Sequence, residues 1–292
     1  MTMLDMIISI LSFFPVIGLA TLGGLITQKS GVWNIAIEGM MAFGTFAGVF
    51  GYHYLGRSLF NALLFGFLGG LMLGGLLALL CVRLGLDQIV VGFGLWFLGE
   101  GLSGFMYSTI VPSTKIEDRL PQLLLSLDPV FYVSILGFAG LYIVLRYMKA
   151  GLAIIATGED PKVADSAGID VYKIRWLCTV LGSGIISLAG AYLSIAVLQG
   201  FSYRMVAGYG WAAFALILFG RWEVPGSLLG SLLFTFLVGA QTRLQIAGVN
   251  ILPPTFMVVI PQIGVLLAVA IGAVLGKKAG MPSALGVHYG RE

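Results

Sequence analysis

Residues 151–175 read GLAIIATGEDPKVADSAGIDVYKIR and form the one long polar segment of this 292-residue sequence. On either side of it, Val130–Met148 and Trp176–Leu198 are apolar. Each is long enough to cross a bilayer as a helix, which takes about 20 residues. The polar segment is therefore expected to lie outside the membrane, between two spans. We refer to residues 151–175 as the hook.

The composition is that of a membrane protein. Hydrophobic residues make up 59% of the chain and charged residues only 10%, a balance that a water-soluble domain does not show. The apolar runs are long and continuous, whereas the strands of a membrane barrel alternate over roughly 10 residues. The sequence thus predicts an all-α polytopic membrane protein with a single transmembrane domain over residues 1–292. We attribute its 42 glycines to close helix packing.

About nine apolar stretches are predicted to cross the membrane, within a range of roughly eight to ten because the first could be split and the seventh is short. They are Leu4–Thr27, Ile35–Tyr54, Phe60–Val82, Ile89–Tyr107, Val130–Met148, Trp176–Leu198, Met205–Gly220, Gly226–Thr242 and Phe256–Gly276. With the hook in the cytoplasm, eleven of the 16 lysines and arginines fall on the cytoplasmic side, as the positive-inside rule requires. This arrangement predicts that the N-terminus is outside and the C-terminus inside.

Two polar residues near the start of the second span need an explanation. A charged side chain in the hydrocarbon costs about 2.5–3.5 kcal/mol even on insertion scales, so it requires a partner or a water-lined cavity. Glu38 follows Asn34 by one helical turn, so both would point the same way. Either they bind free backbone groups where the first two helices meet, or they belong to a gate or pathway.

The fourth span carries a stripe of aromatic and polar residues. Its members are Phe93, Trp96, Glu100, Ser103 and Tyr107. Their steps of three and four residues place them on one face of a helix. Such a face could stack on a flat base and accept its N–H groups. The alternative is plain packing, with Tyr107 in the interfacial aromatic belt.

The hook contains the signals of a short helix. Asp160 can accept hydrogen bonds from free backbone N–H groups, and Pro161 suits a first helical turn. The helix is predicted over Lys162–Ala167, and Gly168 ends it. It would lie across the cytoplasmic face and fit a groove of a partner, or else it is an ordinary amphipathic loop. The small residues that we expect it to expose are Ala164, Ala167 and Gly168.

Several segments together carry a resemblance to a known family. They are Gly31–Met40, Asp87–Gly92, Ala156–Pro161, Ala167–Tyr172 with Arg175, Ala207–Gly208 and Phe219–Trp222. In these segments the chain resembles the permease subunits of bacterial ATP-binding-cassette importers of the ribose and branched-chain amino acid superfamily, most closely the nucleoside (basic membrane protein) branch. The resemblance implies a multi-pass permease of the bacterial or archaeal cytoplasmic membrane.

The resemblance also implies that Glu159–Ile169 is the coupling helix, which docks into a cytoplasmic ATPase. The residues assigned to this contact are Glu159, Asp160, Pro161, Lys162, Ala164, Ala167, Gly168 and Ile169. The chain's nearest approach to a phosphate-binding loop, Gly272–Lys278, has the wrong spacing and no Ser or Thr after the lysine. We therefore expect ATP hydrolysis in a partner subunit and no enzymatic activity, cofactor or metal site in this chain.

Further partners follow from the same resemblance. A second permease subunit, identical or paralogous, would share the translocation path, and an extracytoplasmic binding protein, often a lipoprotein, would deliver the substrate. Arg204 and Arg243 fall at the predicted outer surface, where acidic residues of that protein could meet them. No basic run indicates nucleic acid.

The expected function is import of a nucleoside, with Phe93, Trp96, Glu100, Ser103, Asn34 and Glu38 as pathway residues. Monosaccharide and riboflavin permeases of the superfamily look alike and stay open as alternatives. An ion-coupled secondary transporter is the alternative from another class. It would use Glu38 and Glu100 as its coupling pair.

Overall fold

The computed structural model describes residues 3–110, 116, 118–123, 126–246, 261–264, 267, 270 and 280–290. In these residues all regular structure is helical. The helices are α1 (Met3–Leu11), α2 (Phe14–Lys29), α3 (Ile37–Tyr54), α4 (Leu59–Ala78), α5 (Gln88–Ile110), α6 (Pro129–Tyr147), α7 (Lys149–Glu159), α8 (Pro161–Ser166), α9 (Val171–Tyr192), α10 (Tyr209–Phe219) and α11 (Val224–Ile246). Two π-helical turns, Leu79–Arg83 and Leu193–Val197, extend α4 and α9.

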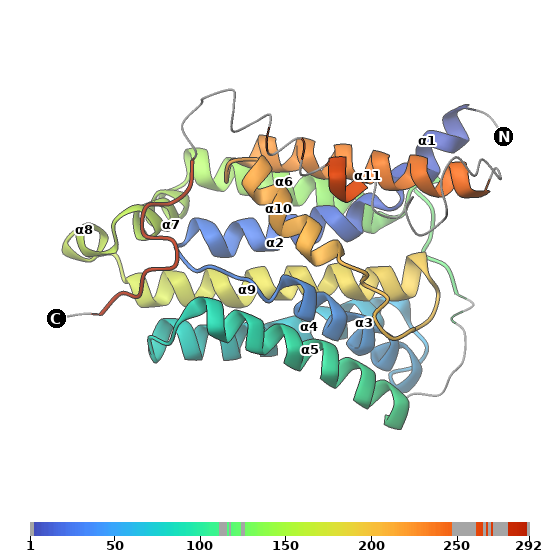
Figure 1. Cartoon of the computed structure of the whole chain (residues 1–292), viewed down its shortest axis with the longest axis horizontal. Coiled ribbons are helices and arrows are strands. Elements are labelled where there is room, and N and C mark those ends of the chain that lie inside the picture. Colours follow the sequence, from blue (N-terminus) through green and yellow to red (C-terminus); the bar gives the residue numbers. More distant parts are fainter. Residues whose placement is uncertain are drawn as a thin grey trace.

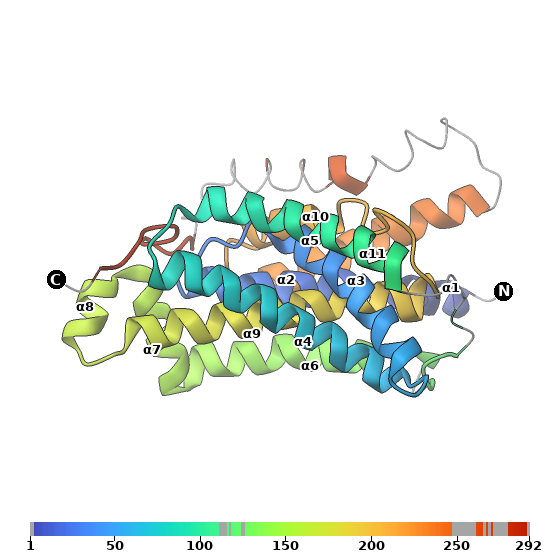
Figure 2. The same ribbon diagram turned by 90° about the horizontal axis from the view of Figure 1, so that it is seen from below.

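The long helices lie side by side around α9, which contacts α2, α3 and α4. Figure 1 shows them running along the longest axis of the molecule, and both views place α5 and α6 on opposite faces of the bundle (Figure 2). The N-terminus and α1 lie at one end, and α7, α8 and the C-terminus lie at the other (Figure 1). We call these the α1 end and the hook end.

Glycines allow the helices to approach α9 closely. A Cβ atom at Gly44 would meet the backbone of Ser187, and one at Gly66 would meet the side chain of Ala191. At Gly70 it would meet the backbone of α9 again. These GxxxG-spaced residues therefore serve packing within the chain, as the sequence predicts.

Six described helical segments are long and apolar enough to cross a membrane. They are Ile7–Lys29, Leu59–Arg83, Gln88–Thr109, Pro129–Tyr147, Val171–Val197 and Val224–Arg243. The first of them is interrupted at Ser12 and Phe13, where Pro15 opens α2 without an N–H group to donate. These segments correspond to six of the nine predicted spans.

The other three predicted spans differ from simple crossings. The second corresponds to α3, which lies buried inside the bundle. The seventh corresponds to α10, whose 11 residues are too few to cross a bilayer as a helix. The ninth, Phe256–Gly276, falls mostly outside the described residues. The total of nine and the orientation of the termini stay predictions.

Two helices, α3 and α10, begin inside the bundle. The loop 30–36 turns back from the hook end, and residues 198–208 turn back from the α1 end, so both helices start near the middle of the long axis (Figure 1). Their N-termini meet at the Glu38 carboxylate in the first turn of α3. One oxygen accepts a hydrogen bond from the N–H of Gly208 at 2.8 Å, and the other accepts from Gly210 at 2.7 Å and Trp211 at 3.3 Å.

The Glu38 carboxylate provides hydrogen-bond acceptors for the free N–H groups at the start of α10. The first N–H groups of a helix have no partner within the helix, and they give that end a partial positive charge. Glu38 is only 7% exposed, so no bulk water replaces it. One buried carboxylate thus provides the acceptors for α10 and complements the positive end of α3.

Residues 198–223 pass from the α1 end to the hook end, partly without helical structure. At the hook end the Trp222 indole N–H donates to the Gln28 amide oxygen at 2.7 Å. Next to it, the Lys29 ammonium lies 3.7 Å from a carboxylate oxygen of Glu223. Non-helical backbone at membrane depth is tolerated only where protein or water satisfies its polar groups, and Glu38 contributes to this for residues 208–211.

Replacing Glu38 by Gln is expected to lower the free energy of unfolding by about 2 kcal/mol, because the new amide N–H group would face backbone N–H groups. The matched control is Glu100→Gln, since the ion-pair partner of Glu100, Arg204, is largely exposed. That change should cost less than about 1 kcal/mol. Denaturant titration in detergent micelles measures both. Equal losses in the two variants would contradict the role given to Glu38.

Candidate functional site

The stripe on α5 faces the segment that leads into α10. The Trp96 ring packs edge-on against Trp211 with centroids 5.0 Å apart, and Phe93 lies 6.1 Å from the same ring. Further along α5, Tyr107 stacks on Phe201 at 4.0 Å. The predicted alignment of these residues on one face is thus confirmed. The structure adds the partner that covers the face, residues 201–211.

Of the polar members of the stripe, Glu100 takes part in the same contact, whereas Ser103 bonds within α5. A carboxylate oxygen of Glu100 lies 3.3 Å from Nε of Arg204. The Ser103 hydroxyl donates to the Glu100 carbonyl at 2.9 Å and is buried within the helix. The indole N–H of Trp96 is buried and has no acceptor among the described residues. An acceptor on a bound solute could therefore pair with it.

Arg204 has a partner within this chain, because its guanidinium pairs with Glu100. Its contact with acidic residues of another protein at the outer surface stays a prediction. Sequence reasoning also missed Trp211 and Phe201 as members of the site. Only their aromatic character pointed to them, since the contact joins residues about one hundred positions apart.

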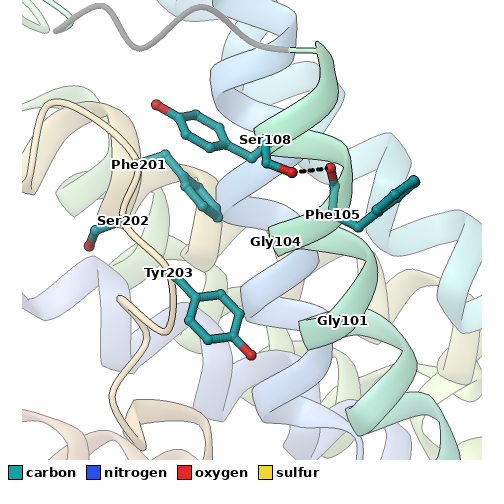
Figure 3. Close-up of a pocket in the computed structure, with 8 residues that line it drawn as sticks. Gly101, Gly104, Phe105, Ser108, Phe201, Ser202 and Tyr203 are labelled. Carbon is teal, nitrogen blue, oxygen red and sulfur yellow. Dashed lines mark hydrogen bonds between the residues drawn. The ribbon is translucent and has the colours of Figure 1, made fainter.

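An open groove of about 590 Å³ lies between α5 and residues 201–203. Figure 3 shows the Tyr203 ring lying over Gly101 and Gly104, while the ring of Phe105 points away from the groove. The absence of a side chain at Gly104 makes room for Tyr203, because a Cβ there would lie 2.9 Å from the ring. Aromatic rings, hydroxyl groups and glycine backbone thus line the groove, a combination suited to a flat polar solute.

A second hollow, of about 700 Å³, opens at the α1 end. Gln199 and Tyr209 line it together with residues of α1, α9 and α11. At its wall the Tyr192 hydroxyl donates to the Asp128 carboxylate at 2.5 Å. Residues of the segment 198–211 therefore line both hollows, the one beside α5 and the one at the α1 end.

This segment holds several residues in the left-handed backbone region. Gln199, Arg204 and Ala207 have φ values of 50°, 60° and 52°. Residues with a Cβ adopt such values rarely, and each costs roughly 1–3 kcal/mol. The conformation is therefore held by contacts around it, among them the Arg204–Glu100 pair and the bonds from Glu38 to Gly208 and its neighbours.

Asn34 and Glu38 do not share a helical face. Because α3 begins only at Ile37, Asn34 lies in the loop before the helix. Its side-chain oxygen, Oδ1, accepts a hydrogen bond from the Ala36 N–H at 3.0 Å, and its side-chain nitrogen, Nδ2, donates to the sulfur of Met40 at 3.4 Å. Asn34 thus shapes the turn into α3. Glu38 binds free backbone groups, as one interpretation of the sequence proposed, but those of α10 and not those of the first two helices.

The hook forms the predicted short helix to within one residue. The Asp160 carboxylate accepts from the N–H groups of Lys162 and Val163 at 3.0 and 3.1 Å, and Pro161 occupies the first turn. Gly168 follows the helix with a φ of 83°, which a residue without Cβ adopts freely. The local sequence alone determines this element, because cap and terminator act within a few residues.

One expectation about the hook is corrected. Ala164 is only 2% exposed, packed against Val171 and Tyr289, because the C-terminal residues cover the inner side of α8. Arg175, at the end of the hook, lies in α9, which begins at Val171. Its guanidinium is buried and donates to the carbonyl groups of Thr157 at 3.1 Å and Val287 at 2.8 Å.

Within the described part of the chain, no three His, Cys, Asp or Glu side chains come together as a metal site. Cys81 and Cys178 are buried free thiols. The polar groups of the site instead bind backbone groups and one another.

Comparison with known proteins places these observations in a family. The profile of the family described as branched-chain amino acid transport system / permease component matches residues 6–271. A permease of Haloferax volcanii provisionally named for glucose transport, TsgC13, is 32% identical over 94% of both chains. The nucleoside permease NupC of Lactococcus lactis is 30% identical over 92% of this chain and 91% of its own.

A third relative, the guanosine permease NupQ of Bacillus subtilis, is 29% identical over 93% of this chain and 92% of its own. No solved structure gives a significant match. The family match covers most of the chain, and six helices are long and apolar enough to cross a bilayer. This chain therefore belongs to the family of permease components of branched-chain amino acid transport systems and is a multi-pass protein of the cytoplasmic membrane.

Proposed function

We propose that this chain is the permease subunit of an ATP-binding-cassette importer that carries a nucleoside. The observation that carries the proposal is the similarity, over more than nine-tenths of the chain, to permeases named for nucleoside and guanosine transport. The aromatic lining of the α5 groove supports it, because rings of this kind stack on a base whatever its identity. The Haloferax volcanii relative named for glucose makes a monosaccharide the second candidate.

In this proposal the substrate pathway runs along the segment 198–211. The pathway residues are Phe93, Trp96, Glu100 and Ser103 on α5, with Arg204 and Trp211 opposite them. Asn34 and Glu38 act indirectly, because they set where α3 and α10 begin. The hollow at the α1 end would receive substrate from an extracytoplasmic binding protein, and the groove beside α5 would continue the path.

A second permease subunit is proposed to cover the open face of α5. Val90 and Phe97 are 70% and 63% exposed on this face. Gly94 lies between them along the helix and Gly101 lies one turn beyond Phe97, and a Cβ at either glycine would meet nothing within 4 Å. Small residues on an exposed helical face let a second helix approach closely. Whether that subunit is identical or paralogous does not affect the argument.

The hook end is proposed to face the cytoplasm, where α8 contacts a separate ATPase. The support is the shape of α8, a rigidly capped helix at the tip of the molecule (Figure 1). The outward position of the N-terminus and the inward position of the C-terminus follow from this orientation. The ion-coupled alternative has less support, because Glu38 and Glu100 are both engaged by partners within the chain.

Uptake in cells tests the proposal directly. Labelled nucleosides, glucose, ribose and riboflavin are offered to cells that lack the gene and to cells in which it is restored. We expect nucleoside uptake to return with the gene, to stop when ATP is depleted and to survive collapse of the proton gradient. Uptake of glucose alone would favour the second candidate. Uptake that follows the proton gradient would refute the importer.

Substitution at the end of α8 tests the coupling role. Gly168→Val is expected to reduce the number of nucleosides imported per ATP hydrolysed, because valine resists the φ of 83° and shifts the end of α8. Gly168→Asn is the matched control, since asparagine tolerates this conformation. Both are measured in proteoliposomes with the complete transporter. Equal transport ratios for valine and asparagine would show that the position of α8 does not matter.

Shortening one aromatic side chain of the stripe tests whether the stripe binds the substrate. Trp96→Ala is expected to raise the KM for uptake at least about fivefold, the effect of losing one stacking partner of a base. Leu98→Ala, on the same helix and partly exposed, should leave the KM unchanged. Expression of both variants is compared by immunoblot. An unchanged KM in Trp96→Ala would show that the stripe serves only to pack the helices and does not bind the substrate.

A further inference from the structure

The C-terminal residues 280–290 are fastened along the hook end. We call them the strap. The N–H of Ala284 donates to the carbonyl of Gly158 at the end of α7, at 2.9 Å. The N–H of Gly286 donates to the carbonyl of Gly31 at 3.1 Å. The strap therefore joins the hook to the loop that leads into α3.

Side chains reinforce these backbone bonds. The Glu159 carboxylate accepts from the N–H and the hydroxyl of Ser283, at 3.2 and 2.8 Å. The buried guanidinium of Arg175 donates to the Val287 carbonyl at 2.8 Å, and the Tyr172 hydroxyl donates to the carbonyl of Tyr289 at 3.1 Å. Every part of the strap thus has a partner on α7, on α9 or on the loop.

The strap also supports α8 from its inner side. Tyr289 is 7% exposed and forms a small core with Ala164 of α8 and Val171 of α9. Because Ala164 faces this core, α8 presents its opposite side outward, where Val163 is 61% exposed. A displacement of the strap would remove the packing surface on which α8 rests.

Exposed apolar side chains occur on the strap as well as on α8. Met281 is 41% exposed and Val287 is 54% exposed. Both views show the strap and α8 side by side at the hook end (Figures 1 and 2). This end lies beyond the apolar spans, so lipid does not cover these side chains. Apolar side chains exposed to water on neighbouring elements are a common feature of protein interfaces.

We infer that the strap is the second half of the ATPase-docking surface, so that the ATPase subunit binds α8 and residues 281–287 together. This inference rests on the proposed function, since it takes the ATPase contact at α8 as given. Its basis is that the strap is bonded to α7, packs under α8 and, like α8, exposes apolar side chains at the hook end. The strap acts both as a contact and as the support that fixes the position of α8.

Binding of the purified ATPase subunit of the same transporter tests the inference. This chain is placed in nanodiscs, and the dissociation constant is measured for Met281→Glu, Val287→Glu and Val163→Glu. All three side chains are exposed, so the substitutions should leave folding intact, which thermal unfolding checks. Leu55→Glu is the matched control, because Leu55 is an exposed apolar residue (37%) at the α1 end.

We expect each of the two strap variants to weaken binding at least about tenfold, as an unpaired charge in an interface core does, and Leu55→Glu to bind like the parent. Normal binding by both strap variants, together with loss in Val163→Glu, would overturn the inference and leave the proposed function intact. Normal binding by all three would overturn both. Loss in Leu55→Glu as well would overturn the inference, because the effect would not be local.

Discussion

The buried carboxylate of Glu38 is the interaction on which the interior of this protein depends. The bilayer core has no water to satisfy free backbone groups, yet α10 starts at that depth with unpaired N–H groups. Three of these groups donate to one side chain of α3. Without that acceptor the N–H groups at the start of α10 would be buried without these partners, at a cost in free energy for each of them.

The parts of the structure that sequence predicts are those with local causes. Asp160, Pro161 and Gly168 cap, open and end α8 within nine residues, so its bounds follow from the chain itself. The α5 stripe follows from helical periodicity. The partners of the stripe and of Glu38 cannot be predicted in this way, because Arg204 and Gly208 lie more than one hundred positions from the residues that they contact. Ala164 was misjudged for the same reason, since the residue that covers it, Tyr289, is distant in sequence.

A continuous set of contacts leads from the hook to the middle of the bundle. Glu159 holds Ser283 of the strap, and Gly286 of the strap holds Gly31. From Gly31 the loop enters the bundle and becomes α3, which carries Glu38 in its first turn. A force applied to the hook would thus reach the start of α10 through hydrogen bonds and one short loop. The two ends of this route are the proposed sites of ATPase contact and of substrate passage.

The left-handed residues of segment 198–211 have an energetic consequence. Three strained residues at roughly 1–3 kcal/mol each store free energy of the same order as the binding of a solute at millimolar affinity, about 4 kcal/mol. The contacts of Arg204 with Glu100 and of Gly208 with Glu38 have to compensate this free energy, so the loss of either contact would favour relaxation of the backbone.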